Sequence, residues 1–165
     1  MNQKELFYNL EKNITFTEES IKEEDFLLSL YASTREDELS MTSMSQMEKK
    51  NFISQQFNLR QTEYKQKFDD AKFLIIKRKK QNIGRLVYNS RDKIHLIDIA
   101  FVKKARANGF GTKIINALIV YANKQNKIFK LSVATDNLRA LKLYEKLGLK
   151  IVDTQGHYYF METPN

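Results

Sequence analysis

Three short runs rich in β-branched and aliphatic residues lie close together in the middle of the chain. They read KFLIIKR (72–78), IGRLVYN (83–89) and IHLIDIAFV (94–102), with polar residues between them. Runs of this length and composition, separated by polar turns, are typical of consecutive β-strands. The sequence therefore predicts an antiparallel meander over 72–102, and any fold of this chain must be built around it.

After the meander, the pattern alternates between helix and strand. A glycine turn is followed by a helical stretch from about Gly111 to Asn123, the run IFKLSV (128–133), the helical stretch LRALKLYEKLG (138–148) and two closing runs, LKIVD (149–153) and HYYFME (157–162). The order strand, turn, helix, strand predicts a right-handed crossover to a parallel neighbour. The expected fold is therefore α/β (α+β), with a mixed, mostly antiparallel central sheet flanked by helices.

Before residue 72 the chain is helical by pattern. Ser20 with Glu23, and Ser45 with Glu48, fit capping boxes, in which the two side chains satisfy backbone N–H groups at a helix start. Apolar residues recur at helical spacing in the second of these segments: Ile53, Phe57, Tyr64 and Phe68. We expect a helical N-terminal part.

One domain spanning 1–165 suits the length and composition. The chain has 165 residues, 42% of them hydrophobic, and no repeat or proline before Pro164 marks a linker. It has no 18-residue apolar run, and its first residues carry acids and amides, which predicts a cytoplasmic protein without a membrane segment. Without cysteine, and with His95 and His157 as its two histidines, the chain is a poor candidate for a metal site.

The net charge of +8 suits an anionic partner. Nucleic acid, an acidic membrane surface and a phosphate-rich cofactor all meet that requirement, and charge alone does not choose among them. The densest basic run, Lys77–Lys80, lies between two predicted strands and is interpreted first as a solvated hairpin turn. A basic nucleic-acid-binding module stays the alternative outside enzymes, although most aromatic residues fall at core periodicity.

The segment FVKKARANGFGTKIINALIVYA (101–122) places an arginine and two glycines between the meander and the next helix. A helix start exposes unpaired N–H groups and the positive end of the dipole, and glycines let the backbone approach an anion. Arg106, Gly109 and Gly111 fit such a site, but their spacing matches neither G-x-x-x-x-G-K-[ST] nor G-x-G-x-x-G. Taken alone, R-x-x-G-x-G fits a plain strand-to-helix turn equally well, with Gly109 at a positive φ.

A second motif follows one predicted strand later. In ATDNLRALKLYEKLGLKIV (134–152), the residues from Asn137 to Gly148 form the pattern N-x-x-A-x-x-L-Y-x-x-L-G. Together with R-x-x-G-x-G, this motif resembles the GNAT superfamily of N-acetyltransferases, and the correspondence runs from about Ile83 to Glu162. The resemblance implies an N-acetyltransferase that uses acetyl-CoA, with R/Q-x-x-G-x-G/A holding the pyrophosphate.

The resemblance also implies roles for individual residues. The pyrophosphate loop would consist of Arg106, Ala107, Asn108, Gly109, Phe110, Gly111 and Thr112, donating mainly backbone N–H groups. Main-chain groups of Ile99, Ala100 and Phe101 would face pantetheine, with Asn137 and Tyr144 along the pantetheine arm and thioester. Two departures affect the loop, because KKA precedes Arg106 where a proline turn is common, and Ala107 stands where glycine is usual.

Acetyl transfer to an amine requires a neutral nucleophile, stabilisation of an oxyanion and a proton for the departing thiolate. By the resemblance Tyr144 supplies the proton, although its helical spacing also fits an ordinary core tyrosine. Asn137 equally fits a helix N-cap. Asp98 and His95 are the candidates for the base, and without a bulge strand alternation places them on opposite faces. Each also has a structural interpretation, as a hydrogen-bonded histidine or as a carboxylate that anchors a neighbouring segment.

Side chains from the second predicted helix and the closing strand are expected at the acceptor pocket: Phe52, Gln56, Phe57, Tyr64, Tyr158 and Tyr159. For any one of the aromatic residues, packing on the sheet is the plainer alternative. The amine itself, whether a small molecule or a peptide or protein, is not identified by the sequence, and the oligomeric state is open, a homodimer included. A third interpretation keeps the CoA site but uses it for sensing, without turnover.

Overall fold

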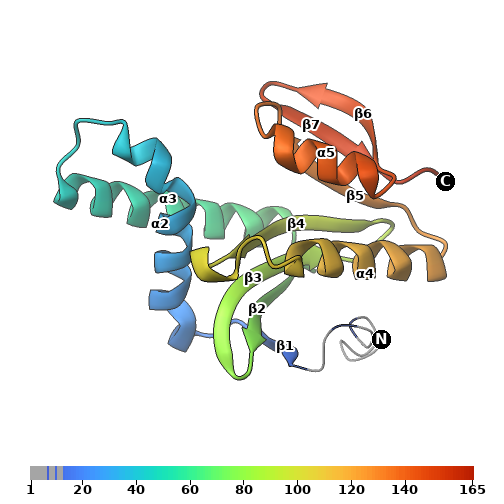
Figure 1. Ribbon diagram of the computed structural model, residues 1–165, viewed down its shortest axis with the longest axis horizontal. Coiled ribbons are helices and arrows are strands. Elements are labelled where there is room, and N and C mark those ends of the chain that lie inside the picture. The colour runs from blue at the N-terminus through green and yellow to red at the C-terminus, as the bar shows by residue number, and fades with distance from the viewer. Residues whose placement is uncertain (1–6, 8–9, 11–12) are drawn as a thin grey trace.

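A seven-stranded mixed sheet forms the centre of the molecule (Figure 1). The computed structural model describes residues 7, 10 and 13–165. The strands are β1 (Ile14–Glu18), β2 (Lys72–Arg78), β3 (Gln81–Asn89), β4 (Ile94–Phe101), β5 (Phe129–Ala134), β6 (Lys150–Gln155) and β7 (Tyr158–Glu162). Their order is β1-β2-β3-β4-β5-β7-β6, and every neighbouring pair is antiparallel except β4 and β5. The mixed, mostly antiparallel sheet predicted from the sequence is confirmed.

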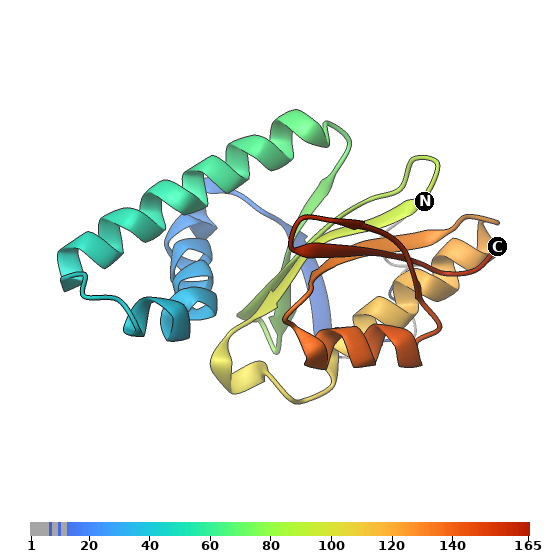
Figure 2. The same cartoon turned by 90° about the horizontal axis from the view of Figure 1, so that it is seen from above.

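Helices cover both faces of this sheet. They are η1 (Ile21–Glu23), α2 (Glu24–Ser40), α3 (Gln46–Lys67), η2 (Lys103–Ala105), α4 (Phe110–Lys124) and α5 (Leu138–Lys146). Alternation along β2 explains the two layers, because Leu74 and Ile76 join the core that α4 covers, whereas Ile75 packs with residues of α2 and α3. Figure 2 shows α2 and α3 on one side of the sheet, with α4 and α5 on the other.

The helix starts follow the sequence signals. The Ser45 hydroxyl accepts from the N–H of Glu48 at 3.2 Å, and the Glu48 carboxylate accepts from the N–H of Ser45 at 2.6 Å. Ser20 and Glu23 form the corresponding capping box at η1, which leads directly into α2. Both predicted capping boxes are therefore confirmed, whereas α4 begins without a side-chain cap.

The first strand differs from the expectation, because the sequence pattern predicts only helices before residue 72. Residues Ile14–Glu18 pair antiparallel with β2 and form the edge of the sheet. The segment ITFTE alternates apolar and polar residues, so that Ile14 and Phe16 face the core, and the Phe16 ring stacks on that of Phe7 at 4.0 Å. Only five residues carry this alternation, and the strand needs β2 as a partner.

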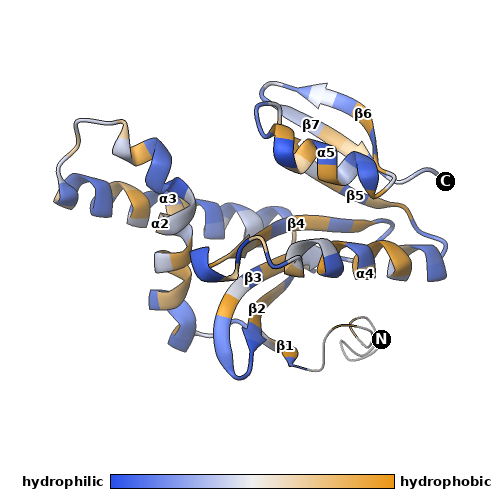
Figure 3. Cartoon of the chain, in the orientation of Figure 1, coloured by the Kyte–Doolittle hydropathy of each residue, from blue (hydrophilic) through white to orange (hydrophobic). Residues whose placement is uncertain are grey.

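The basic run Lys77–Lys80 spans the end of β2 and the two-residue turn that leads into β3, which agrees with the hairpin interpreted from the sequence. Lys79 and Lys80 adopt φ angles of 47° and 69°, and Figure 3 shows this turn as hydrophilic beside apolar strands. The guanidinium carbon of Arg78, the last residue of β2, lies 5.2 Å from the ring centroid of Phe110, so the end of this strand contacts the start of α4. In the part of the chain that the structure describes, none of the helices has the length and apolar composition needed to cross a bilayer.

Candidate active site

Strands β4 and β5 separate after a short parallel stretch. Their pairing covers only residues 94–96 of β4 and 129–131 of β5. On its other side β4 stays paired with β3 as far as Phe101, which lies opposite Gly84. One edge of β4 is therefore open from about residue 98 onward, which leaves a gap within the sheet.

The backbone direction decides which groups face that gap. The N–H of Val102 donates to the carbonyl oxygen of Ile83 on β3 at 2.9 Å, so Ala100, two residues earlier, also directs its backbone groups to β3. By the same alternation, the N–H and C=O of Ile99 and the N–H of Phe101 face the gap. These groups form the kind of strand edge to which an extended ligand adds by backbone hydrogen bonds.

Arg106 ties the turn that follows β4 to two other elements. Its Nε donates to the carbonyl oxygen of Phe101 at 2.9 Å, and its Nη2 donates to the hydroxyl of Ser33 on α2, also at 2.9 Å. Ala107 adopts φ 60°, a left-handed conformation that costs an L-residue about 1–2 kcal/mol. Gly109 is the N-cap of α4 at φ 76°, the positive φ considered for it from the sequence.

The start of α4 presents backbone donors to open space. The first paired N–H of the helix is that of Lys113, which donates to Gly109 O at 3.1 Å, so the N–H groups of Phe110, Gly111 and Thr112 have no intrahelical acceptor. A Cβ built on Gly109 meets no heavy atom of the described chain within 4 Å, and one on Gly111 meets only Phe101 Cε2, at 3.4 Å. These donors and the helix dipole suit an anion.

On the β5 side of the gap, α5 carries Asn137 and Tyr144. Asn137 Oδ1 accepts from the N–H of Ala140 at 3.2 Å, so Asn137 is the N-cap considered for it. Tyr144 packs against the core beneath α4, and burial raises the pKa of its hydroxyl. That hydroxyl forms no hydrogen bond with any residue the structure describes, so its proton stays available to a ligand.

A cavity of about 190 Å³ lies on the other face of β4, under α2 and α3. Its lining consists of Leu27, Leu30, Tyr31, Thr34, Phe57, Arg60, Arg85, Asp98, Ile99 and Ala100. Because Ile99 also directs its backbone groups into the gap, the cavity and the gap meet at this residue. The volume lies below the roughly 300–1,000 Å³ of pockets for drug-sized ligands. It suits a small molecule or the end of a longer one.

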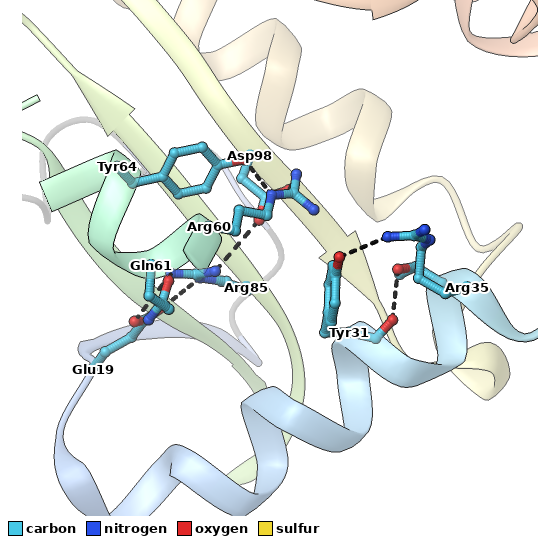
Figure 4. Close-up of polar contacts among 9 residues, drawn as sticks. Glu19, Tyr31, Arg35, Arg60, Gln61, Tyr64, Arg85 and Asp98 are labelled. Carbon is cyan, nitrogen blue, oxygen red and sulfur yellow. Dashed lines mark hydrogen bonds and ion pairs between the residues drawn. The ribbon is translucent and has the colours of Figure 1, made fainter. Parts of the chain in front are cut away.

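Asp98 lies between two arginines in the wall of this cavity (Figure 4). Its Oδ1 is 3.4 Å from Arg60 Nη2, and its Oδ2 is 3.5 Å from Arg85 Nη1. Arg85 is buried and also donates to Glu19 at 2.6 Å and to the side-chain oxygen of Gln61. The network joins β3, β4, α3 and the segment after β1. Asp98 thus makes the contacts expected of a carboxylate that anchors neighbouring segments, which was its structural interpretation from the sequence.

Arg60 is the more exposed arginine of the network, with 37% of its side chain accessible. Its Nε donates to the Tyr64 hydroxyl at 2.5 Å. Its guanidinium carbon lies 5.2 Å from the ring centroid of Tyr64 and 5.7 Å from that of Tyr31. The guanidinium is therefore held between two aromatic rings at the edge of the cavity.

A β-bulge in β4 brings the two candidate bases to the same face of the sheet. Residue 96 pairs with Tyr88, whereas Asp98 pairs with the adjacent Val87, so Ile97 is the extra residue. Asp98 consequently contacts Arg60 of α3, and His95, on the same face, contacts Phe68 at the C-terminal end of that helix. A bulge is the exception to strict alternation that was considered for these two residues from the sequence.

His95 has a different environment from Asp98. Its ring makes an edge contact with Phe68, at the end of α3, with centroids 5.3 Å apart. Burial, helped by the positive charges of Lys130 and Lys67, lowers the pKa of His95 to about 4. The imidazole is therefore neutral at pH 7. It lies where β4 is still paired with β5, before the gap opens.

The residues predicted for the acceptor pocket lie in three different places. Phe57 lines the cavity, Tyr64 holds Arg60 at its edge, and Gln56 lies one helical turn before Arg60. Phe52 packs in the cluster between α2 and α3 instead.

Tyr158 and Tyr159 belong to β7, on the far side of β5, and are not among the residues that line the cavity. Tyr159 packs partly against the core, whereas Tyr158 is 53% exposed. Their role at an acceptor stays a prediction.

Five residues of the network and of the cavity edge were not among the site residues predicted from the sequence: Glu19, Tyr31, Arg60, Gln61 and Arg85. A local signal existed for Arg85, because a charge within the apolar run IGRLVYN requires a buried partner. The partners themselves are 38 positions apart for Arg60 and Asp98, and 66 for Arg85 and Glu19. Local patterns contain no information on contacts of that range.

Comparisons with known proteins agree with this geometry. The sequence model of the acetyltransferase (GNAT) family matches residues 34–149, well over half of the chain. No curated protein gives a match. The PaiA N-acetyltransferase from Thermoplasma acidophilum, in complex with coenzyme A, has a TM-score of 0.67 and 18% identity, over 92% of this chain and 99% of that one.

Two further solved structures show the same fold. A variant of the spermidine N-acetyltransferase SpeG from Vibrio cholerae has a TM-score of 0.59 and 16% identity, over 92% of this chain and 94% of that one. A GNAT family acetyltransferase from Elizabethkingia anophelis with acetyl-CoA bound has a TM-score of 0.60 and 15% identity, over 94% of this chain and 100% of that one. At these identities the likeness is one of fold.

Proposed function

The chain belongs to the GNAT family of acetyltransferases, and from that premise we propose that it is an N-acetyltransferase that moves the acetyl group of acetyl-CoA to a primary amine. One observation carries the proposal: the uncapped start of α4 lies directly after the open edge of β4. A diphosphate and an extended amide-bearing arm need these two features in this order. The relatives in complex with coenzyme A or acetyl-CoA support the same choice of cosubstrate.

The residues present fit acetyl-CoA, which supplies an acetyl thioester when bound. The N–H groups of Phe110, Gly111 and Thr112 would hold the diphosphate, since no side chain caps this helix start and a Cβ built on Gly109 meets no heavy atom of the described chain within 4 Å. The backbone groups of Ile99 would orient the pantetheine arm along β4. The N–H of Phe101 also faces the gap and would donate to the oxyanion that develops during transfer.

Tyr144 is assigned to donate a proton to the departing thiolate. Its hydroxyl is half-buried, has no hydrogen-bond partner in the described chain, and has a pKa raised by burial. The phenol consequently stays protonated through neutral pH, which is the form that a proton donor needs.

The attacking amine must lose a proton, since an alkylammonium group titrates near about 10.4 in water. Among the described residues Asp98 is the carboxylate in the cavity wall, and we assign it to accept this proton, directly or through water. Arg60 and Arg85 place positive charge beside the same space, which disfavours the ammonium form of a bound amine. His95, neutral and beside the paired part of β4, is less well placed.

Calorimetric titration of the purified protein with acetyl-CoA, and separately with a single-stranded oligonucleotide, tests the binding part of this proposal. We expect one acetyl-CoA to bind per chain, and affinity to fall as salt rises because phosphates meet a positively charged loop. Binding of the oligonucleotide without binding of acetyl-CoA would favour the nucleic-acid alternative and overturn the proposal.

A further inference from the structure

The charged residues that line the cavity under α2 and α3 indicate which second charged group the acceptor amine has. Three charged residues line the cavity: Arg60, Arg85 and Asp98. Asp98 already has both arginines as partners, and Glu19 behind it is bound by Arg85. Each of these carboxylates is therefore engaged, and none is left over in the described lining to bind a second cationic group of an acceptor.

Arg60, in contrast, has donors to spare. A guanidinium has five N–H donors. In Arg60 one is used by the Tyr64 hydroxyl, and one on Nη2 by Asp98 across a long 3.4 Å. Its Nη1 contacts no acceptor within the described chain. The planar edge formed by Nη1 and Nη2 is the edge that binds a carboxylate with two parallel hydrogen bonds.

The aromatic rings beside Arg60 hold this edge in place. Tyr64 fixes the guanidinium through Nε, and the ring of Tyr31 lies 5.7 Å from it on the α2 side (Figure 4). The Tyr31 hydroxyl accepts from Arg35 Nη1 at 2.7 Å, so its own proton remains available for a second acceptor. Tyr31 also lines the cavity, so this proton is a further donor beside Arg60.

We propose that the acceptor is a small primary amine that also carries a carboxylate, and that Arg60 binds this carboxylate with help from the Tyr31 hydroxyl. The inference rests on the proposed acetyltransferase function and deepens it. A cavity of about 190 Å³ has room for an acceptor of amino-acid size or for the end of a peptide. A polyamine fits poorly, because its second ammonium group would meet two arginines and no unpaired carboxylate of the described lining.

The test measures release of CoA thiol from acetyl-CoA by the full chain with matched amine pairs. Each pair consists of a carboxylated amine and the same amine without the carboxylate: phenylalanine and phenethylamine, leucine and isoamylamine, 4-aminobutyrate and propylamine. Spermidine is included as the polyamine. In at least one pair we expect a higher kcat/KM for the carboxylated member, and spermidine should be used less well than that member.

Variants assign the preference to Arg60. Arg60→Gln should lower the ratio of the two kcat/KM values within the preferred pair by about tenfold or more, the usual effect of losing hydrogen bonds to a charged group. We compare this ratio between variant and wild type because the two amines of a pair differ in basicity. That difference affects both proteins equally and therefore cancels in the comparison. Arg60→Lys keeps the charge but lacks the planar edge. Its ratio should lie between those of the wild type and Arg60→Gln. Arg91→Gln, at a surface pair with Asp69 and Asp70, makes the same charge change away from the cavity and should leave the ratio unaltered.

Two results would overturn the inference while leaving acetyl transfer intact. One is preferred use of spermidine or of the carboxylate-free member in every pair. The other is an unchanged ratio in folded Arg60→Gln or Arg60→Lys. Failure of the wild type to bind acetyl-CoA in calorimetry would overturn the proposed function, and this inference with it.

Discussion

The Nε of Arg106 donates to the carbonyl oxygen of Phe101 at 2.9 Å, which fastens the loop before α4 to the last residue of β4. The same guanidinium reaches Ser33 on α2 through Nη2. Arg106 therefore braces three elements. Under the proposed function, we expect it to act on a bound phosphate through the position of the loop as well as through its charge.

Removing this brace should weaken acetyl-CoA binding. We expect Arg106→Ala to lower the affinity by about tenfold or more, since hydrogen bonds from a charged donor contribute about 1.5–3 kcal/mol. Ser33→Ala removes only one of the two bonds and keeps the charge, so its loss should be smaller and in the same direction. Calorimetry measures both, and wild-type affinity in both variants would contradict the bracing role.

A side chain at Gly111 should block the diphosphate without unfolding the protein. An added Cβ meets only Phe101 Cε2, at 3.4 Å, so the described fold has room for it. At the proposed site, the two methyl groups of valine would compete with the diphosphate for the space beside the N–H groups. Gly111→Val should abolish measurable acetyl-CoA binding at an unfolding temperature close to wild type. Asn116→Val places the same β-branched residue at an exposed position of α4 and should bind normally. Normal binding of acetyl-CoA by folded Gly111→Val would contradict the diphosphate site at the start of α4.

Ala107 should be a site where glycine stabilises the chain. A φ of 60° destabilises an L-residue by about 1–2 kcal/mol, and glycine removes this strain. Glycine also has the greater conformational entropy in the unfolded chain, which destabilises the folded state by about 0.5–1 kcal/mol. Ala107→Gly should therefore raise the free energy of unfolding by up to about 1 kcal/mol. Ala105, buried and without a positive φ, provides the control, because Ala105→Gly should destabilise. Denaturant unfolding decides, and a destabilised Ala107→Gly would contradict the strain argument.

The case of Ala107 illustrates what the sequence could predict about the site. The motif located the loop, the helix start and the positive φ of Gly109, because these follow from local residue types. It also marked Ala107 as a departure from the usual glycine, although only the structure shows that the alanine keeps the left-handed conformation.

The acceptor side was less predictable, for a physical reason. Phe57 and Tyr64 were identified by helical spacing, but the charges beside them come from β3, β4 and the segment after β1. The bulge at Ile97, which brings His95 and Asp98 to one face, depends on pairing with β3 and leaves no mark in the run IHLIDIAFV. Strand β1 was missed for a similar reason, since its five residues are a strand only beside β2.

Loss of the Tyr144 hydroxyl should slow transfer more than it weakens binding. Tyr144→Phe keeps the ring, so packing on the core should survive, whereas the proton for the thiolate is lost. We expect the single-turnover rate to fall by about 10²-fold, the lower end for general acid catalysis, because a thiolate is already a fair leaving group. Single-turnover kinetics avoid masking by slow product release. A rate equal to wild type would return Tyr144 to a packing role.

His95 should make the folded state sensitive to acid. Its folded pKa of about 4 lies below the ordinary value of about 6.5, so as pH falls the unfolded chain takes up this proton first. The stability that neutral His95 contributes is thus complete above about pH 6.5 and is lost as pH falls from there toward 4. His95→Gln should lose less stability than wild type between pH 7 and pH 4.5 in denaturant unfolding.

The exposed His157 allows the same substitution, His157→Gln, at a position away from the contact with Phe68, as the matched control. The same variants bear on catalysis. If Asp98 takes the proton, His95→Gln should keep the wild-type shape of the pH profile of kcat/KM. An identical pH dependence of stability in His95→Gln and wild type would contradict the buried, neutral state of this histidine.

We propose that this chain transfers acetyl groups from acetyl-CoA to amines at the junction of β4 and α4. The most direct measurement mixes the purified protein with acetyl-CoA and a panel of primary amines, follows free CoA thiol, and identifies the product by mass spectrometry. We expect thiol release that depends on one or more amines, with one N-acetylated product formed per thiol and none with folded Gly111→Val. Binding of acetyl-CoA with no amine-dependent thiol release would contradict it and indicate a sensor.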